Sequence, residues 1–94
     1  MEEQKHNYRI AIISLIVEQT DCAVSINDLL HQYSSFIIGR MGLPCPARGL
    51  SIISVAVDAP QEKISALSGR LGALPGVSAK TLYAKTGGDD DERS

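Results

Sequence analysis

The chain has 94 residues, and its 9 Lys and Arg residues against 11 Asp and Glu residues give a formal net charge of -2. This length allows one hydrophobic core and not two, and a hydrophobic fraction of 44% excludes a wholly disordered chain. The slightly acidic balance argues against binding of nucleic acid by bulk charge, because neutralising phosphates requires clustered Lys and Arg. No apolar run approaches the roughly 20 residues of a membrane span.

Both ends of the chain are polar. Residues 1–7 lack a basic segment followed by an apolar one, so we expect a disordered N-terminus and no signal peptide. Residues 87–94, GGDDDERS, are predicted to be a disordered acidic tail, which leaves residues 8–86 as the folded domain. Cys22 and Cys45 are interpreted as reduced thiols, and we expect a cytoplasmic protein.

The first half of the domain predicts a strand, a helix and a second strand. Residues 8–18 are rich in β-branched side chains, as is typical of a strand. A helix follows, with one apolar face formed by Ile26, Leu29, Leu30 and Tyr33. A second strand is predicted over residues 35–41, in which Gly39 indicates a bulge or a close approach by another backbone.

The second half repeats this order after a loop. Residues 42–49 carry two prolines, which cannot donate to a sheet, and are predicted to be that loop. A strand over residues 50–57 follows, then a helix that begins after Asp58 and carries Ile64, Leu67, Leu71 and Leu74 at helical spacing. The last element is a strand over residues 77–85. The order β-α-β-β-α-β predicts an α+β, ferredoxin-like fold, a four-stranded antiparallel sheet with both helices on one face.

The strands are apolar on both faces, although two helices can cover only one. In the first strand, Ile10, Ile12 and Ile16 alternate with a second apolar set. An uncovered face of this kind would be unusual for a monomer, so we predict a dimer or tetramer formed through the sheet. The predicted interface residues are Ala11, Ile13, Leu15, Ile52, Ser54 and Ala56. The alternative is that the N-terminal segment or the acidic tail folds back over this face.

No catalytic or metal-binding constellation is found in the sequence. His6 and His31 lack a second ligand at metal-site spacing, and there is no C-x-x-C motif. Residues 18–22 are acidic and hold one cysteine, unlike the corresponding loops of an acylphosphatase or a metallochaperone, and residues 50–57 lack the aromatics of an RNA-recognition domain. We therefore expect a protein that is not an enzyme, and no cofactor is assigned.

One small ligand site is predicted from arginine and glycine residues. Arg40, Gly42, Arg48 and Gly49 lie near one another in the sequence, and an arginine beside free backbone N–H groups binds small anions. The alternative is that the arginines form surface or interface ion pairs.

The segments YRIAIISLIVE, LLHQYSSFIIGRMGLP, GLSIISVAVDAP and ISALSGRLGALPGVSAKTLYAK together resemble the small bacterial family of iron-only hydrogenase system regulators. The resemblance covers about residues 8–85, and its most specific parts are residues 39–44 and 68–77. It implies a ferredoxin-like fold similar to ACT domains and to the C-terminal domain of nickel-responsive repressors, which assemble through their sheets and bind effectors or metals at interfaces. This chain lacks the paired histidines of a nickel site.

The leading hypothesis is an oligomeric, ACT-like protein that regulates a hydrogenase system, as a transcriptional regulator or sensor of a small-molecule effector. Its partners would be further copies of itself and the effector, with no direct contact to nucleic acid or membrane. The alternative is a scaffold for hydrogenase maturation without an effector, in which the tail residues 89–92 dock on a basic surface.

Overall fold

The two strands richest in β-branched residues form the central pair of the sheet. This computed structural model describes residues 7–18 and 20–85. Strand β1 (Tyr8–Val17) pairs with β3 (Leu50–Pro60) on one side and with β4 (Val77–Tyr83) on the other, and β2 (Ile37–Cys45) flanks β3. The sheet order is therefore β2-β3-β1-β4, and every pairing is antiparallel.

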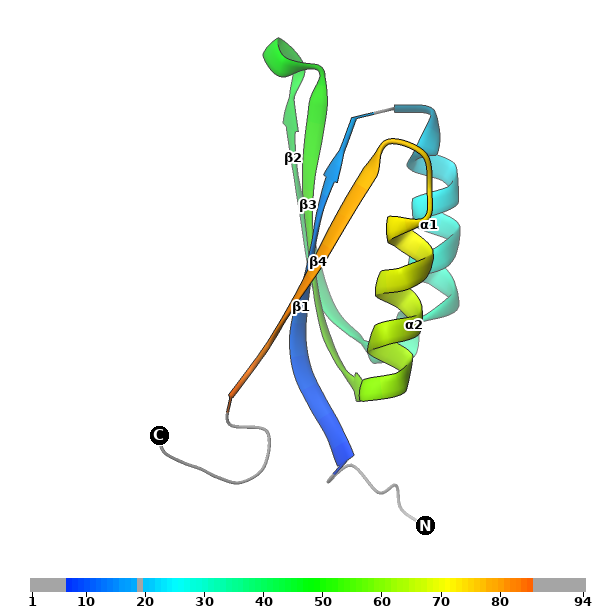
Figure 1. Cartoon of the computed structure of the whole chain (residues 1–94), viewed down its shortest axis with the longest axis vertical. Helices are drawn as coiled ribbons and strands as arrows, with labels where there is room; N and C mark the ends of the chain where they lie inside the picture. Colours follow the sequence, from blue (N-terminus) through cyan, green and yellow to red (C-terminus); the bar gives the residue numbers. More distant parts are fainter. Residues whose placement is uncertain (1–6, 19, 86–94) are drawn as a thin grey trace.

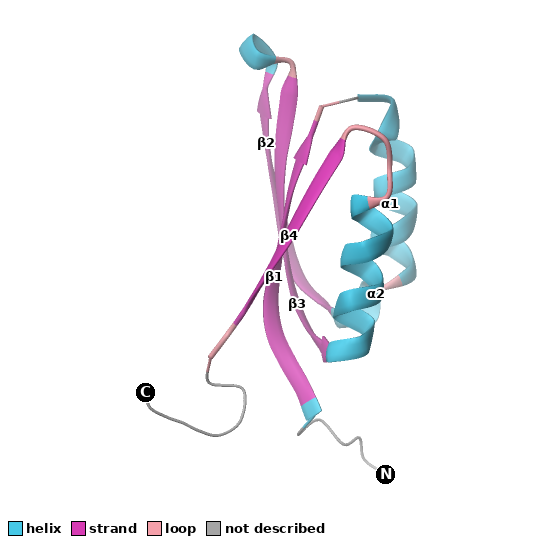
Figure 2. Cartoon of the chain, in the orientation of Figure 1, coloured by secondary structure: helices cyan, strands magenta, loops and turns pink. Residues whose placement is uncertain are grey.

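The helices α1 (Ala23–Gln32) and α2 (Gln61–Gly72) both pack on one face of the sheet, which leaves the other face without a covering element (Figures 1 and 2). This arrangement confirms the predicted ferredoxin-like β-α-β-β-α-β fold. Short 3-10 turns precede α1, follow it and cap the hairpin between β2 and β3. The predicted disordered N-terminus and acidic tail fall on residues 1–6 and 87–94, which lie outside the described residues.

The core lies between the helices and the covered face of the sheet. Ile13, Leu15, Val55 and Val57 from the sheet are at most 1% exposed. The helices contribute the positions that their spacing predicted to be apolar, namely Ile26, Leu30, Ile64, Leu67 and Leu71. The described helices include none long and apolar enough to cross a membrane.

The predicted interface residues of β1 lie on its helix-covered face. Ala11, Ile13 and Leu15 are at most 2% exposed and lie beneath the helices, so their assignment to an interface is wrong. Ile52 is 38% exposed and lies on the opposite face, in register with Ile16. Both sets of alternating residues are apolar, and a period of two shows which residues share a face but not which face the helices cover.

Strand β2 is longer than predicted. It continues through residues 42–45, which were expected to be loop, and pairs with β3 up to Cys45. Pro44 is compatible with this strand because β2 lies at the edge of the sheet, where every second backbone N–H faces solvent and forms no ladder bond. The register shifts between Ile37 and Gly39, which confirms the predicted bulge.

The hairpin between β2 and β3 closes on a left-handed residue. Gly49 has φ 70° and follows the 3-10 turn of residues 46–48. Figure 1 shows this hairpin tip extending past the end of the helix layer.

We expect Leu15→Ala to lower the free energy of unfolding by about 2–5 kcal/mol, because the side chain is fully buried. Val24→Ala is the control, since Val24 on α1 is 71% exposed, and its loss should stay within about 0.5 kcal/mol. Urea unfolding of both variants at one protein concentration makes the measurement. Equal losses would contradict the placement of Leu15 in the core.

We expect Gly49→Ala to cost about 1–2 kcal/mol, because an L-residue is strained in the left-handed region. The control is Gly42→Ala, since Gly42 has no positive φ and an added Cβ would meet nothing within 4 Å. Thermal unfolding of the two variants compares them, and a Gly49→Ala protein as stable as the control would argue against this turn.

Candidate functional site

Arg40 lies at the boundary between the edge of the sheet and α1. Its register with the buried Val55 places its side chain on the helix-covered face. There its Nη2 donates a hydrogen bond to Oδ1 of Asn27 on α1, at 2.9 Å. Strand and helix thus hold the guanidinium in position at the open edge of the molecule.

Two hollows meet at Arg40. One, of about 180 Å³, lies under the start of α1 and is lined by residues of β1, α1, β2 and β3: Val17, Ala23, Ile26, Asn27, Arg40, Ser51 and Ile53. The other, of about 350 Å³, lies between α1, the turn that follows it and β2. It is lined by Asn27, Leu30, His31, Ser34, Ile37 and Arg40. Asn27 and Arg40 line both, so the pair separates the two hollows.

The guanidinium of Arg40 has donors to spare. Arginine carries five N–H donors, and among the described residues it makes only the bond to Asn27. A planar guanidinium with free N–H groups binds a carboxylate or phosphate in bidentate fashion. Ser34 and His31 add a hydroxyl and an imidazole to the lining of the larger hollow, so the site has the chemistry to bind a small anion.

The four predicted ligand residues divide into two groups. Gly42 lies two positions from Arg40 on β2 and is in register with Ile53, which lines the smaller hollow. Arg48 and Gly49 lie instead at the hairpin tip. The five residues of strand from Arg40 to the start of that tip span about 16 Å, so the structure does not bring the two arginines together.

Asn27, His31 and Ser34 were missed as site residues. Asn27 and His31 are polar residues outside the predicted apolar face of the first helix. Their spacing of four residues, which puts both on one helical face, was the available signal. This spacing was not sufficient to identify the site, because the contact between Asn27 and Arg40 depends on how β2 packs beside α1.

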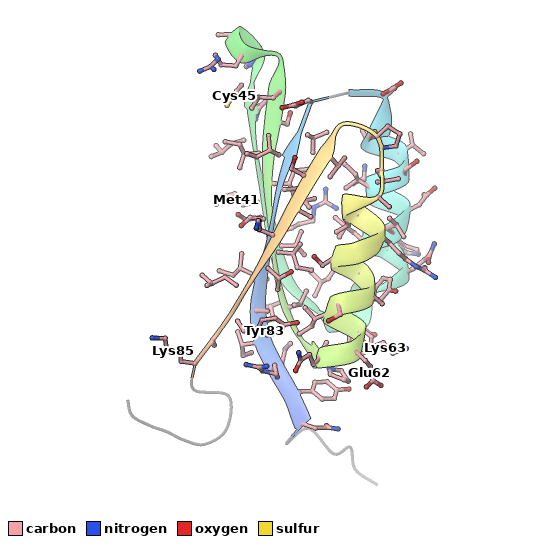
Figure 3. The ribbon with its side chains drawn as sticks, in the orientation of Figure 1. Met41, Cys45, Glu62, Lys63, Tyr83 and Lys85 are labelled. Carbon is pink, nitrogen blue, oxygen red and sulfur yellow. The ribbon has the colours of Figure 1, made fainter. Side chains whose placement is uncertain are left out.

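The cysteines do not form part of this site. Both are free, and the Cys22 thiol is buried and donates to the carbonyl oxygen of Pro75 at 2.8 Å. Cys45 lies at the end of β2, near the hairpin tip (Figure 3). The part of the chain that the structure describes holds no group of three or more His, Cys, Asp or Glu residues that could bind a metal.

The second candidate surface is the sheet face that no helix covers, called here the outer face. Its large apolar side chains are 38–72% exposed: Ile10, Ile12, Ile16, Met41, Leu43, Ile52 and Leu82. Met41 projects from the side of the sheet away from the helices (Figure 3). Small residues lie among the large ones in two cross-strand pairs. Ser14 is in register with Ser54, and Gly39 is in register with Ala56.

The solved structures that resemble this chain include a relative of similar sequence and a protein that shares only its fold. The protein TM1266 from Thermotoga maritima, described as uncharacterised, superposes with a TM-score of 0.79 and 33% identity, covering 83% of this chain and 99% of that one. The C-terminal domain of the MgtC protein from Mycobacterium tuberculosis superposes with a TM-score of 0.67 and 12% identity, covering 96% of this chain and 100% of that one, which shows a common fold alone. No curated protein matches the sequence.

A family model gives the assignment. Residues 9–81 match the TM1266-like family, whose description reads "Iron-only hydrogenase system regulator, putative". This range spans all four strands and both helices apart from the first and last residues of the sheet. The chain therefore belongs to the TM1266-like family of iron-only hydrogenase system regulators.

Proposed function

We propose that this chain is a non-enzymatic, ACT-like regulatory protein of the cytoplasm that self-associates through its outer face and senses a small anionic effector at Arg40. The uncovered apolar face is the main support for this proposal, because monomeric proteins rarely expose an apolar surface of this size to water. Its seven large side chains expose on the order of 700 Å², close to the 800 Å² that each partner buries in a standard interface.

The effector part of the proposal is supported by Arg40. The guanidinium is held by Asn27 yet keeps free donors, and it borders two hollows that open beside α1. A carboxylate or phosphate bound there would bridge β2 and α1. It would thereby stabilise the packing of an edge strand that is otherwise bound to the sheet on one side only.

The second candidate function is a scaffold for hydrogenase maturation without an effector. The exposed apolar face favours it as well, since such a face suits a different protein partner as well as a second copy. The two functions differ at Arg40, which a scaffold does not require as a ligand site.

We expect a thermal-shift screen with amino acids, nucleotides, inorganic phosphate and divalent metals to reveal an anion that raises the Tm. A ligand at 100 times its Kd stabilises the folded state by about 2.7 kcal/mol. Arg40→Gln should abolish the shift, because it removes the charge and the bidentate fork. Arg48→Gln, at the hairpin tip, is the control and should retain it.

A flat screen with the wild-type chain would remove the sensing function and leave the scaffold. A shift of the same size in Arg40→Gln would move the ligand site elsewhere.

We expect sedimentation at micromolar concentration to show a dimer or tetramer, which Leu82→Glu shifts toward monomer by burying a charge in the interface. Val24→Glu is the matched control, because Val24 is 71% exposed on α1 and Leu82 is 72% exposed on the outer face. The control should stay associated. A wild-type chain that sediments only as monomer would refute self-association.

A further inference from the structure

The outer face carries two charges of opposite sign among its apolar residues. Within the four strands as the structure describes them, its outward charged side chains are Asp58 on β3 and Lys80 on β4. Asp58 follows the buried Val57, and Lys80 precedes Thr81, whose Oγ1 donates to Ser68 of α2 on the covered side. Neither charge forms an ion pair with another described residue.

The register of the sheet fixes how these charges are placed. Asp58 pairs with Ile10 of β1 and Lys80 pairs with Ser14 of β1, on opposite sides of that strand. Ile12 lies between Ile10 and Ser14, so it is at the midpoint of the line that joins the two charges. Two strand spacings and four residues of rise separate the charges by about 16 Å, too far for a direct pair.

We infer that two copies of this chain pack outer face to outer face about a twofold axis over Ile12, and that Lys80 of each copy pairs with the partner's Asp58. The inference rests on the proposed self-association and adds its orientation. This axis lies in the plane of the interface, passes over Ile12 and is perpendicular to the line that joins the two charges. A half-turn about it places Lys80 of one copy opposite Asp58 of the other. Each lysine then meets an aspartate, and the contact occurs twice, as an isologous interface requires.

The same rotation matches apolar side chains. It brings the two copies of Ile12 together on the axis. Leu82, the neighbour of Ile12 on β4, comes opposite the partner's Ile10. The strands of the two sheets then cross steeply, as in orthogonal sheet packing.

A second copy is the occupant that this face fits. A partner of unrelated sequence would need its own acid and base at the spacing of Lys80 and Asp58, whereas a second copy supplies them through symmetry. Each copy exposes on the order of 700 Å² of large apolar residues on this face, to be compared with about 800 Å² per partner in a standard interface. Opposite charges placed across an interface favour one orientation, because like charges brought together in another orientation repel.

Charge reversal tests this orientation. In a dimer of Lys80→Glu, each new glutamate faces an aspartate, and in a dimer of Asp58→Lys, each new lysine faces Lys80. Both contacts are repulsive and occur twice, so we expect each variant alone to self-associate at least tenfold more weakly than the wild type. An equimolar mixture of the two restores both pairs, and we expect heterodimers with close to wild-type affinity in sedimentation or native mass spectrometry. Lys63→Glu, on the exposed side of α2, is the control and should leave association unchanged. Circular dichroism checks that each variant is folded.

Two failures can be told apart in this experiment. A wild-type chain that stays monomeric refutes the proposed self-association itself. A wild-type dimer whose single variants and mixture all associate equally refutes the reciprocal pairs and leaves self-association standing.

Disulfide cross-linking locates the axis independently. In a Cys45→Ser background, Ile12→Cys should oxidise to a covalent dimer, because a residue on a twofold axis meets its own copy. Ile16→Cys is the matched control, on the same strand and face, with 44% exposure against 41% for Ile12. Its two copies would be roughly 20 Å apart and should not cross-link. Equal cross-linking at both positions would overturn the placement of the axis.

Discussion

Two helices can cover only one face of a four-stranded sheet, and this chain has apolar residues on both. The covered face gains the free energy of burial of fully enclosed Ile, Leu and Val side chains. The outer face keeps residues of the same type in partial contact with water. Many proteins share this fold without sharing a function, so function must be inferred from particular surfaces. In this chain the outer face is such a surface, because its apolar residues are not covered.

The edge position of β2 explains the candidate site at Arg40. An edge strand accepts a proline and a bulge that a central strand would not, and β2 has both, at Pro44 and next to Gly39. Its inward side chain at Arg40 lies at the margin of the helix layer, where it meets Asn27 and still reaches solvent. A cation placed deeper under α1 would be desolvated without a partner.

The order of the elements could be predicted because each depends on local patterns. The spacing of Ile26, Leu30, Ile64 and Leu67 indicated two amphipathic helices, and all four side chains are buried in the structure. The end of β2 could not be predicted in this way, since Pro44 reads as a loop residue unless the strand is known to lie at an edge. Within the candidate ligand site, Arg40 could be identified from the sequence, but its hydrogen-bond partner Asn27 could not, because no local rule links a strand residue to a helix residue 13 positions earlier.

The sequence by itself determined which residues of each strand share a face, because side chains alternate with a period of two. The tertiary structure alone decided that Ala11, Ile13 and Leu15 belong to the core and Ile10, Ile12 and Ile16 to the outer face. The two sets are equally apolar, so hydrophobicity cannot separate them, and the side on which the helices pack makes the distinction. The same holds for Asp58 and Lys80, which are 22 residues apart in the chain and come to lie on opposite sides of β1, on the same face of the sheet, only through the register of three strands.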